Sequence, residues 1–203
     1  VNSYVLDPRP ESEILVEKII DICEKKKEKK ISILELGVGS GCLIISILKE
    51  LDSNQVHGLG VDFSSKALLV AEKNRKRFKM NQAFKIKKSN WFSSIRNKFD
   101  IIFSNPPYIK SNEIKYLDKE VKLFDPLIAL DGGFSGFRSY LKIASEAKHY
   151  LKKNGLILLE LGQGQLNRVS KIFNRFGYQT ILEEKDLQGI NRVVGYKLKN
   201  IES

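Results

Sequence analysis

The sequence contains few cysteines and no long hydrophobic run. Its two cysteines, Cys23 and Cys42, form no CxxC pair and no zinc-ligand spacing, as is typical of proteins from a reducing compartment. Each lies in a segment of periodic apolar residues, which favours a packed thiol over a reactive one. No apolar stretch approaches the roughly 20 residues that span a bilayer. The start, VNSYVLDPRP, lacks the charged flank and apolar core of a secretion signal. These absences predict a cytoplasmic protein with no membrane association and no metal.

Positive charge, in contrast, is in excess. The chain has 35 basic and 24 acidic residues, for a formal net charge of +11. The electrostatic field of this positive charge attracts anionic partners, including RNA and ribosome-bound factors. A lysine-rich surface without a specific partner explains it equally well, because net charge affects association and not fold. The length of 203 residues and a composition of 42% hydrophobic and 29% charged residues predict one globular domain over residues 1–203.

Apolar runs alternate with segments of helical periodicity along the chain. Strands are expected at 31–37, 56–63, 83–90, 98–105, 156–162, 178–186 and 190–198, and helices at 11–25, 41–51, 64–78, 136–155 and 165–177. Ser64 is expected to cap one helix and Gly155 to end another. Continuously apolar strands joined by helices predict an α/β fold, with a mostly parallel sheet and helices on both faces. The last two strands lack an intervening helix, which predicts an antiparallel hairpin at one edge.

Glycines follow the first strand, and an acidic residue ends the second. ELGVGSGC places Gly37, Gly39 and Gly41 where glycine permits a tight turn and lets backbone N–H groups approach a ligand. The GxGxG spacing departs from the GxGxxG of dinucleotide-binding proteins, and a tight turn alone is the plain alternative. Asp62 follows Gly41 by 21 residues, where a carboxylate can accept hydrogen bonds from both hydroxyls of a ribose.

Two further polar residues lie near strand ends, where ligands of open α/β sheets bind. Glu35 can contact the amino group of a bound amino acid, or it can hydrogen-bond the nearby loop backbone. Asn90, in KKSNWF, can bond an adenine edge through its amide. The following Trp91 and Phe92 are more typical of packing residues than of stacking partners.

The stretch FSNPPYIK, after the fourth strand, completes a recognisable pattern. ELGVGSG, VDFS, SNW and NPPY, in this order, resemble the motifs of class I S-adenosylmethionine-dependent methyltransferases that methylate a planar –NH2. VLDPRPESE, EVKLFDPLIALDGGFSGFRSYLKI and LQGINRVVGYK resemble stretches of the release factor glutamine methyltransferases, so that the similarity covers nearly all 203 residues. Asn90 and Ser12 replace the Asp and Thr usual in that family, Val38 replaces a Thr, and Asp7 occupies a normally apolar position.

The resemblance implies a Rossmann-like, seven-stranded fold and S-adenosylmethionine as the cofactor. It implies methylation of the glutamine amide in the GGQ motif of peptide chain release factors. The cofactor-binding residues would be Glu35, Gly37, Gly39, Gly41, Asp62, Asn90 and Asn105. The substrate-binding residues would be Asn105, Pro106, Pro107 and Tyr108, with Asn105, Pro106 and Tyr108 also catalytic. It further implies that the family's N-terminal helical substrate domain is absent from this sequence.

The chemistry of amide methylation explains these residue types. An amide nitrogen is a poor nucleophile because its lone pair is delocalised into the carbonyl. The side-chain oxygen of Asn105 and the main-chain oxygen of Pro106 can accept both N–H bonds, present the lone pair to the methyl group and stabilise the positive charge that develops. Consecutive prolines, Pro106 and Pro107, hold that carbonyl rigidly, and Tyr108 is expected to pack against the planar amide. No strong general base is needed.

Two other functions remain compatible with the sequence. One is methylation of an exocyclic base amine in RNA or DNA, which NPPY and the positive charge both allow. The other is cofactor binding without catalysis, against which the intact NPPY argues. His57 and His149 are expected to be structural. Arg9 and Arg192 are open between two interpretations, substrate binding and ion pairing with carboxylates.

Overall fold

The structure is a computed structural model that describes residues 3–26, 30–51 and 54–199. The elements follow one another as α1 Ser12–Lys25, β1 Ile31–Leu36, α2 Cys42–Glu50, β2 Val56–Asp62, α3 Ser65–Arg77, β3 Phe84–Lys88, β4 Phe99–Ser104, η1 Ile114–Tyr116, α4 Lys119–Phe124, α5 Leu127–Leu130, α6 Arg138–Glu146, η2 Ala147–His149, β5 Leu151–Glu160, α7 Leu166–Arg175, β6 Tyr178–Lys185 and β7 Asn191–Leu198.

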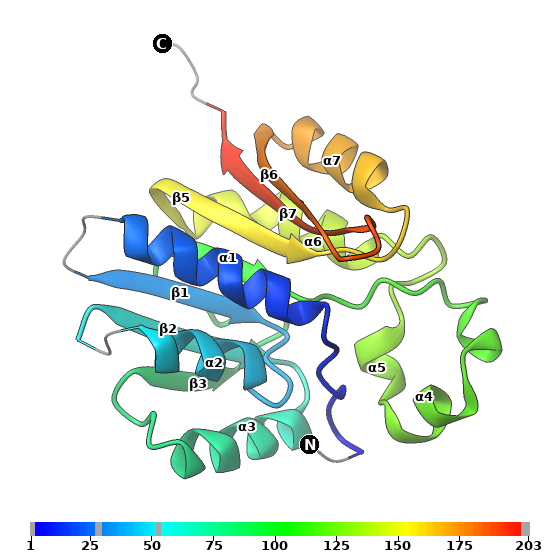
Figure 1. Cartoon of the computed structure of the whole chain (residues 1–203), viewed down its shortest axis with the longest axis horizontal. Helices are drawn as coiled ribbons and strands as arrows, with labels where there is room; N and C mark the ends of the chain where they lie inside the picture. The colour runs from blue at the N-terminus through cyan, green and yellow to red at the C-terminus, as the bar shows by residue number, and fades with distance from the viewer. Residues whose placement is uncertain (1–2, 27–29, 52–53, 200–203) are drawn as a thin grey trace.

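The strands form one seven-stranded sheet in the order β3-β2-β1-β4-β5-β7-β6. The pairs β1–β2, β1–β4, β2–β3 and β4–β5 are parallel, whereas β7 runs antiparallel to both β5 and β6. The strand order reverses between β1 and β4, and ligands of open α/β sheets bind at such a reversal. The predicted fold, a mostly parallel sheet with an antiparallel C-terminal hairpin, is confirmed (Figure 1).

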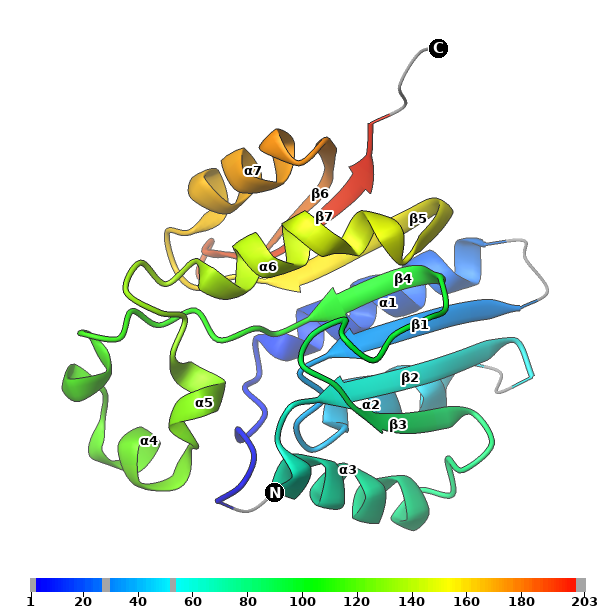
Figure 2. The same ribbon diagram turned by 180° about the vertical axis from the view of Figure 1, so that it is seen from behind.

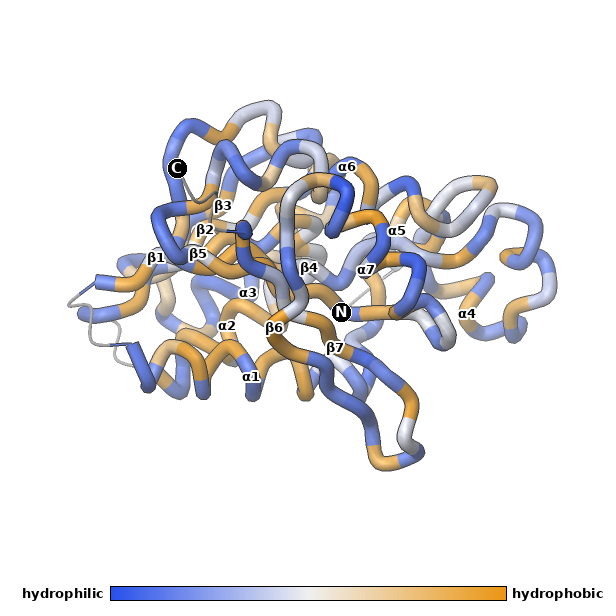
Figure 3. The backbone as a smooth tube through the Cα atoms, turned by 90° about the horizontal axis from the view of Figure 1, so that it is seen from above, coloured by the Kyte–Doolittle hydropathy of each residue, from blue (hydrophilic) through white to orange (hydrophobic). Residues whose placement is uncertain are grey.

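Helices cover both faces of the sheet (Figures 1 and 2). On one face, α1 and α2 bury apolar residues such as Leu15 and Ile44 against Ile33 of β1. On the other face, Tyr140 of α6 and Phe173 of α7 belong to the same cluster as Leu34 of β1. Hydrophobic residues are accordingly concentrated along the strands, and they alternate with hydrophilic residues along α1 (Figure 3). Alternate strand residues therefore feed two separate cores.

The central strand β4 explains how NPPY comes to lie at the edge of this sheet. Ile101 and Phe103 pack into the core beneath α1 and α2, while Ile102 packs into the opposite core. All six residues of β4 are buried, as expected for a strand covered on both faces. At its last position, the Ser104 hydroxyl donates to the Leu36 carbonyl at 2.7 Å. The residue that follows, Asn105, is thereby fixed beside the end of β1.

The helix predicted over residues 136–155 is wrong in its second half. α6 ends at Glu146, the short turn η2 follows, and β5 begins at Leu151. The amide of Phe99 donates to the Tyr150 carbonyl at 2.8 Å, and Phe99 pairs with Leu151 across the sheet. This tertiary pairing overrides the local helical pattern. The left-handed residue is Asn154, with φ of 61°, and not Gly155.

Residues 106–137, between β4 and α6, form a segment with short helices and no strand of the sheet. η1, α4 and α5 lie beyond the carboxyl ends of the parallel strands (Figures 1 and 2). The two ends of the segment meet where the Ile109 amide donates to the Leu130 carbonyl at 3.0 Å and the Gly132 amide donates to the Ile109 carbonyl at 2.8 Å. The segment is thus a long loop whose two ends are hydrogen-bonded to each other, and it forms one wall of the site.

Candidate active site

The carboxyl ends of the parallel strands surround a cavity of about 500 Å³. The N-terminal segment before α1 closes one side of it through Tyr4, Val5, Leu6 and Pro8, and the segment with α5 supplies Pro126, Ile128 and Ala129. Among the sequence-predicted site residues, the structure brings together Glu35, Gly37, Gly39, Asp62, Asn90, Asn105 and Pro107 in this lining. Gly41, Pro106 and Tyr108 do not line it. A cavity of this size lies in the range that holds cofactors.

The three glycines of the turn between β1 and α2 have different surroundings. All three have positive φ, of 71° at Gly37, 52° at Gly39 and 76° at Gly41, which only glycine adopts without strain. A Cβ atom added at Gly37 or Gly39 would meet nothing within 4 Å, whereas one at Gly41 would lie 3.3 Å from Phe84 and 3.4 Å from Ile45. Gly37 and Gly39 therefore leave space for a ligand, and Gly41 serves the packing of α2.

Asp62, the last residue of β2, holds this turn in place. Its carboxylate accepts hydrogen bonds from the Gly39 amide at 3.0 Å and from the Ser64 amide at 2.8 Å. The Ser64 hydroxyl in turn accepts from the Ala67 amide at 3.2 Å, which confirms the predicted cap of α3. Burial raises the pKa of Asp62. A carboxylate has about four lone-pair sites, so Asp62 retains acceptor capacity for a ribose.

Glu35 is buried at 2% exposure beside the first turn of α2. Its carboxylate accepts a hydrogen bond from the Ile44 amide at 3.3 Å. Glu35 therefore makes a backbone hydrogen bond, which was one of the two roles expected from the sequence. Burial, and to a smaller degree the charge of Asp62, raise the pKa of Glu35 well above its usual range. The residue also lines the cavity, where a bound ammonium group would favour its ionised form.

The turn after β3 presents Asn90 and Trp91 to the cavity. The Ser89 hydroxyl organises it by donating to the Trp91 carbonyl at 2.7 Å and accepting from the Ser94 amide at 3.0 Å. Trp91 has a positive φ of 53°. Phe92, in contrast, is buried and stacks on Tyr150 with ring centroids 4.7 Å apart. The predicted packing role is therefore confirmed for Phe92, while Trp91 both touches the core and lines the cavity.

The residues of NPPY point in different directions. Asn105 is half-buried, and its side-chain Nδ2 donates to the Ser12 hydroxyl at 3.3 Å. Pro106 is buried, and no hydrogen bond to its carbonyl is found within the described residues. Tyr108 packs against the core beneath α6 and α7, and its carbonyl accepts from Gln165 at 3.0 Å. Burial raises the pKa of Tyr108 to about 12. The ring contact predicted for Tyr108 with a substrate amide stays a prediction.

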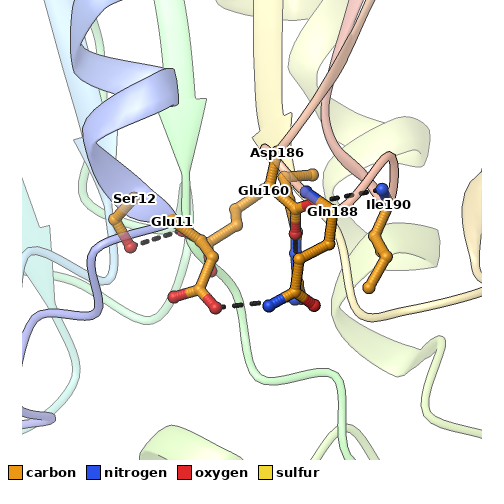
Figure 4. A network of polar contacts seen from close by, with 7 residues as sticks. Glu11, Ser12, Glu160, Asp186, Gln188 and Ile190 are labelled. Atoms are coloured by element: carbon orange, nitrogen blue, oxygen red, sulfur yellow. Dashed lines mark hydrogen bonds and ion pairs between the residues drawn. The ribbon is translucent and has the colours of Figure 1, made fainter.

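Sequence reasoning missed Glu160, which ends β5 and is buried at 2% exposure. It accepts a hydrogen bond of 2.5 Å from the Ser12 hydroxyl (Figure 4). Burial is the main cause that raises its pKa to about 7. A signal was present in the sequence, because ILELG at 33–37 and LLELG at 158–162 place a glutamate at the same point of two apolar strands.

Both arginines whose roles were open pair with carboxylates. Arg9 donates to Asp125 at 2.6 Å, and Arg192 donates to Asp186 at 2.7 Å and to Glu11 at 3.5 Å. Asp186 belongs to the loop between β6 and β7, which reaches the start of α1 (Figure 4). The Arg9–Asp125 pair ties the N-terminal segment to the segment before α5, and the Arg192–Glu11 pair ties the start of α1 to β7. They support the ion-pairing interpretation.

Cys23 belongs to the core cluster beneath α1, and burial raises its pKa to about 12, as a packed thiol requires. Cys42 is half-buried and lines the cavity. Within the described residues, no group of three or more His, Cys, Asp or Glu residues is arranged to hold a metal ion. A search of the same residues for a helix long and apolar enough to cross a bilayer finds none.

Comparison with known proteins agrees with this geometry. Residues 10–121 match the family model of the methyltransferase small domain. Among solved structures, the ribosomal protein L11 methylase of Lactobacillus delbrueckii subsp. bulgaricus superposes with a TM-score of 0.69 at 16% identity, over 95% of this chain and 81% of that one. At this identity the likeness concerns the fold alone. Fold and family model together define a class I methyltransferase, and S-adenosylmethionine is the cofactor of this class.

Closer sequence relatives specify the family. The release factor glutamine methyltransferase of Agrobacterium fabrum is 40% identical over 97% of this chain and 68% of its own length. The bifunctional methyltransferase of Rickettsia prowazekii is 37% identical over 96% of this chain and 40% of its own length. The chain belongs to the family of release factor glutamine methyltransferases. It spans about two thirds of the first relative and less than half of the second.

The residues of the cavity fit S-adenosylmethionine. Gly37 and Gly39 leave open space where a ligand can approach the backbone. Asp62 has acceptor capacity for the ribose hydroxyls, and Glu35 can bind the ammonium group. Asn90 replaces the family's Asp, and its amide oxygen can still accept from the adenine amine. Within the described residues, no hydrogen bond of the Asn90 side-chain amide is found that would compete with this contact.

Proposed function

We propose that this protein transfers a methyl group from S-adenosylmethionine to the side-chain amide nitrogen of the glutamine in the GGQ motif of peptide chain release factors. The reaction would take place in the cytoplasm, where release factors act. The observation that carries the proposal is the position of Asn105, directly after β4 in the wall of the cavity, with its Nδ2 bonded to Ser12. The name of the 40% identical Agrobacterium relative supports the choice of acceptor.

The proposed reaction uses few groups of this chain. The cofactor supplies an electrophilic methyl group on a sulfonium. Asn105 Oδ1 and the Pro106 carbonyl accept hydrogen bonds from the two N–H groups of the glutamine amide, so that the nitrogen presents its lone pair to the methyl carbon. As the N–C bond forms and the S–C bond breaks, the nitrogen becomes positive and both oxygens stabilise that charge. The methylated nitrogen then releases one proton to water, and the thioether product leaves.

Positioning is the main contribution that the protein makes to this reaction. The buried Pro106 fixes φ near −65° and keeps the backbone after Asn105 rigid. Holding reactants in a near-attack arrangement can supply on the order of 7–11 kcal/mol of the barrier. Val5, Leu43 and Ile128 give the cavity apolar walls, and hydrogen bonds to the two oxygens are stronger in apolar surroundings than in water. A preorganised pair of acceptors therefore replaces a general base.

The test is a methyl-transfer assay with three acceptors. Purified protein is incubated with methyl-labelled S-adenosylmethionine and a release factor, the same release factor with the GGQ glutamine replaced by glutamate, or bulk RNA. The proposal predicts label only in the unmodified release factor, located by mass spectrometry on the glutamine of the GGQ motif. Asn105→Ala is expected to reduce transfer by about 100-fold or more, the usual effect of removing a group that stabilises developing charge.

The other outcomes separate the remaining functions. Label in RNA and none in release factor would replace the proposal with methylation of a base amine, which the charge of +11 permits. Cofactor binding without label in any acceptor would indicate a binding protein without catalysis. Binding is read from the fluorescence of Trp91, the single tryptophan of the chain, which lines the cavity.

A further inference from the structure

Three residues from distant parts of the chain meet at one wall of the cavity. Ser12 begins α1, Asn105 follows β4, and Glu160 ends β5. Asn105 Nδ2 donates to the Ser12 hydroxyl at 3.3 Å. The Ser12 hydroxyl donates to Glu160 Oε2 at 2.5 Å, and Figure 4 shows this second bond. Ser12 and Glu160 are each 2% exposed. Buried polar groups of this kind are retained where their hydrogen bonds are complete.

The hydrogen bonds of this chain of residues have one direction. An ionised Glu160 only accepts, so it takes the hydroxyl proton of Ser12. The Ser12 oxygen then has its lone pairs free and accepts from the amide nitrogen of Asn105. Asn105 lowers the pKa of Glu160, which favours the ionised carboxylate. The contact with Ser12 binds the –NH2 end of the Asn105 side chain.

The two ends of an asparagine amide differ in what they offer to a substrate. Because the side-chain nitrogen donates to Ser12, which in turn donates to Glu160, the side-chain oxygen of Asn105 is left to accept a hydrogen bond from an N–H group. A flipped side chain would direct N–H groups at the N–H groups of the substrate amide, and the acceptor would be lost. No hydrogen-bond donor to Asn105 Oδ1 is found in the part of the chain that the structure describes.

We propose that Ser12 and Glu160 are positioning residues that fix the Asn105 side chain with its oxygen toward the methyl-accepting –NH2 group. The inference rests on the proposed role of Asn105 as an acceptor. It does not depend on whether that group belongs to a glutamine or to a nucleobase. Glu160 itself stays out of contact with the cofactor cavity, because it is absent from the residues that line it, whereas Ser12 is among them.

The surroundings of Glu160 make its protonation state relevant to this role. Glu11 raises the pKa of Glu160 and Arg192 lowers it, both less than burial does, and the result is about 7. The phenol of Tyr108 also faces this group, and the Tyr140 hydroxyl donates to the Glu160 carbonyl at 3.0 Å. The Arg192 charge is shared with Asp186 at 2.7 Å. A protonated Glu160 can donate to Ser12 and so remove the fixed direction of the bonds.

The kinetic test uses four variants and whichever acceptor the wild type methylates. Glu160→Gln and Ser12→Ala are expected to lower kcat by about 10- to 100-fold, because a small misplacement of a positioned group can cost up to about 100-fold. KM for S-adenosylmethionine is expected to stay within about twofold of wild type. Ser12→Thr keeps the hydroxyl and is expected to retain activity. The matched control is Glu183→Gln, an exposed glutamate on β6, which is expected to change neither constant.

The pH profile and a double mutant separate positioning from general damage to the fold. Wild-type kcat is expected to fall below pH of about 7, and Glu160→Gln is expected to lose this acid limb. Adding Glu160→Gln to Asn105→Ala is expected to cause no further loss, since residues that act through one another are not additive. Full activity of Glu160→Gln, or additive losses in the double mutant, would overturn the inference.

A measurement without turnover keeps this test independent of the proposed function. In protein labelled with ¹⁵N-asparagine, the Nδ2 proton signals of Asn105 are assigned by their loss in Asn105→Ala. They are expected to shift as Glu160 titrates and to lose this shift in Glu160→Gln. If the chemical shifts of these protons do not change with pH in the wild type, the positioning role is refuted, even if no methyl acceptor is found. Methylation of RNA in place of a release factor would overturn the proposed function and leave this inference standing.

Discussion

The Arg9 guanidinium donates a hydrogen bond of 2.6 Å to the Asp125 carboxylate. The same carboxylate accepts from the Asp7 amide at 3.2 Å. The contact joins the segment before α1 to the segment before α5, and each supplies residues to the cavity wall. Asp125 has a side chain only 4% exposed, whereas that of Arg9 is 40% exposed. The pair therefore holds together two parts of the cavity wall, the segment before α1 and the segment before α5, neither of which belongs to the sheet.

Breaking this pair is expected to weaken cofactor binding more than it weakens the fold. Arg9→Ala leaves the buried Asp125 with one backbone donor and loosens the wall that contains Val5 and Leu6. We expect the dissociation constant of S-adenosylmethionine to rise about 3- to 10-fold, a change of about 1 kcal/mol, because the arginine is partly solvent-screened. Titration monitored by Trp91 fluorescence checks this.

Lys18→Ala is the control for Arg9→Ala, since Lys18 of α1 pairs with Glu184 at 3.2 Å outside the cavity. An equal loss of cofactor affinity in both variants would show that the Arg9–Asp125 pair has no specific effect on the site.

Gly39→Ala and Gly41→Ala are expected to fail in different ways. Both positions have positive φ, so both substitutions strain the backbone by about 1–2 kcal/mol. The methyl group at position 39 would enter the cavity, and that at position 41 would press on Phe84 at 3.3 Å. We expect Gly39→Ala to lose about tenfold or more in cofactor affinity, and Gly41→Ala to show the larger fall in melting temperature. Titration and thermal denaturation of both variants provide the comparison, and equal losses of affinity would contradict it.

The ionisation of Glu160 predicts a pH-dependent stability. Its pKa is about 7 in the fold against an ordinary value of 4.5, so between these values the folded state binds more protons than the unfolded state. The free energy of unfolding therefore falls as pH rises through this window, by roughly 3 kcal/mol at most. Glu160→Gln lacks this titration. The free energy of unfolding of the variant minus that of the wild type is therefore expected to be larger at pH 8 than at pH 4.5. Urea unfolding at both pH values tests this, and parallel pH dependences would count against it.

The sheet could be predicted from the sequence because its strands are continuously apolar. KFDIIFSN identifies β4 without knowledge of its neighbours, and ISILELG identifies β1 in the same way. The start of β5 could not be predicted, because Leu151 becomes a strand residue through pairing with Phe99, which is distant in the sequence. Its local pattern is that of a helix. Pairing across the sheet decided the conformation there.

The site could be predicted only where a motif marks the end of a strand. Asp62 and Asn105 were found in this way, and the parallel sheet brings them to the same edge. The bond between Ser12 and Glu160 joins residues separated by 148 positions. Ser12 lies in VLDPRPESE and Glu160 in the repeated ELG, but neither pattern indicates that the two side chains meet. The N-terminal wall was also missed, because a segment without regular structure has no periodicity to read.

The close packing of Gly162, which follows β5, against Tyr108 leads to a last prediction about the NPPY residues. A Cβ atom at this position would lie 2.8 Å from Tyr108 Cδ2 and 2.9 Å from Gln165 Oε1. Gln165 in turn donates to the Tyr108 carbonyl at 3.0 Å. Gly162→Ala therefore displaces the Tyr108 ring and its backbone contact together, and we expect kcat to fall about tenfold along with a loss of about 1–3 kcal/mol in stability from overpacking.

Gly195→Ala separates these two effects, because Gly195 lies in β7, where a Cβ atom would meet Leu182 at 3.0 Å, away from the cavity. It is expected to lose stability and keep kcat. Tyr108→Phe is expected to keep both, since the ring and not the hydroxyl packs against Gly162. Methyl-transfer kinetics and thermal denaturation of the three variants test this. If Gly162→Ala loses stability but retains wild-type kcat, Tyr108 has no part in positioning the residues before it.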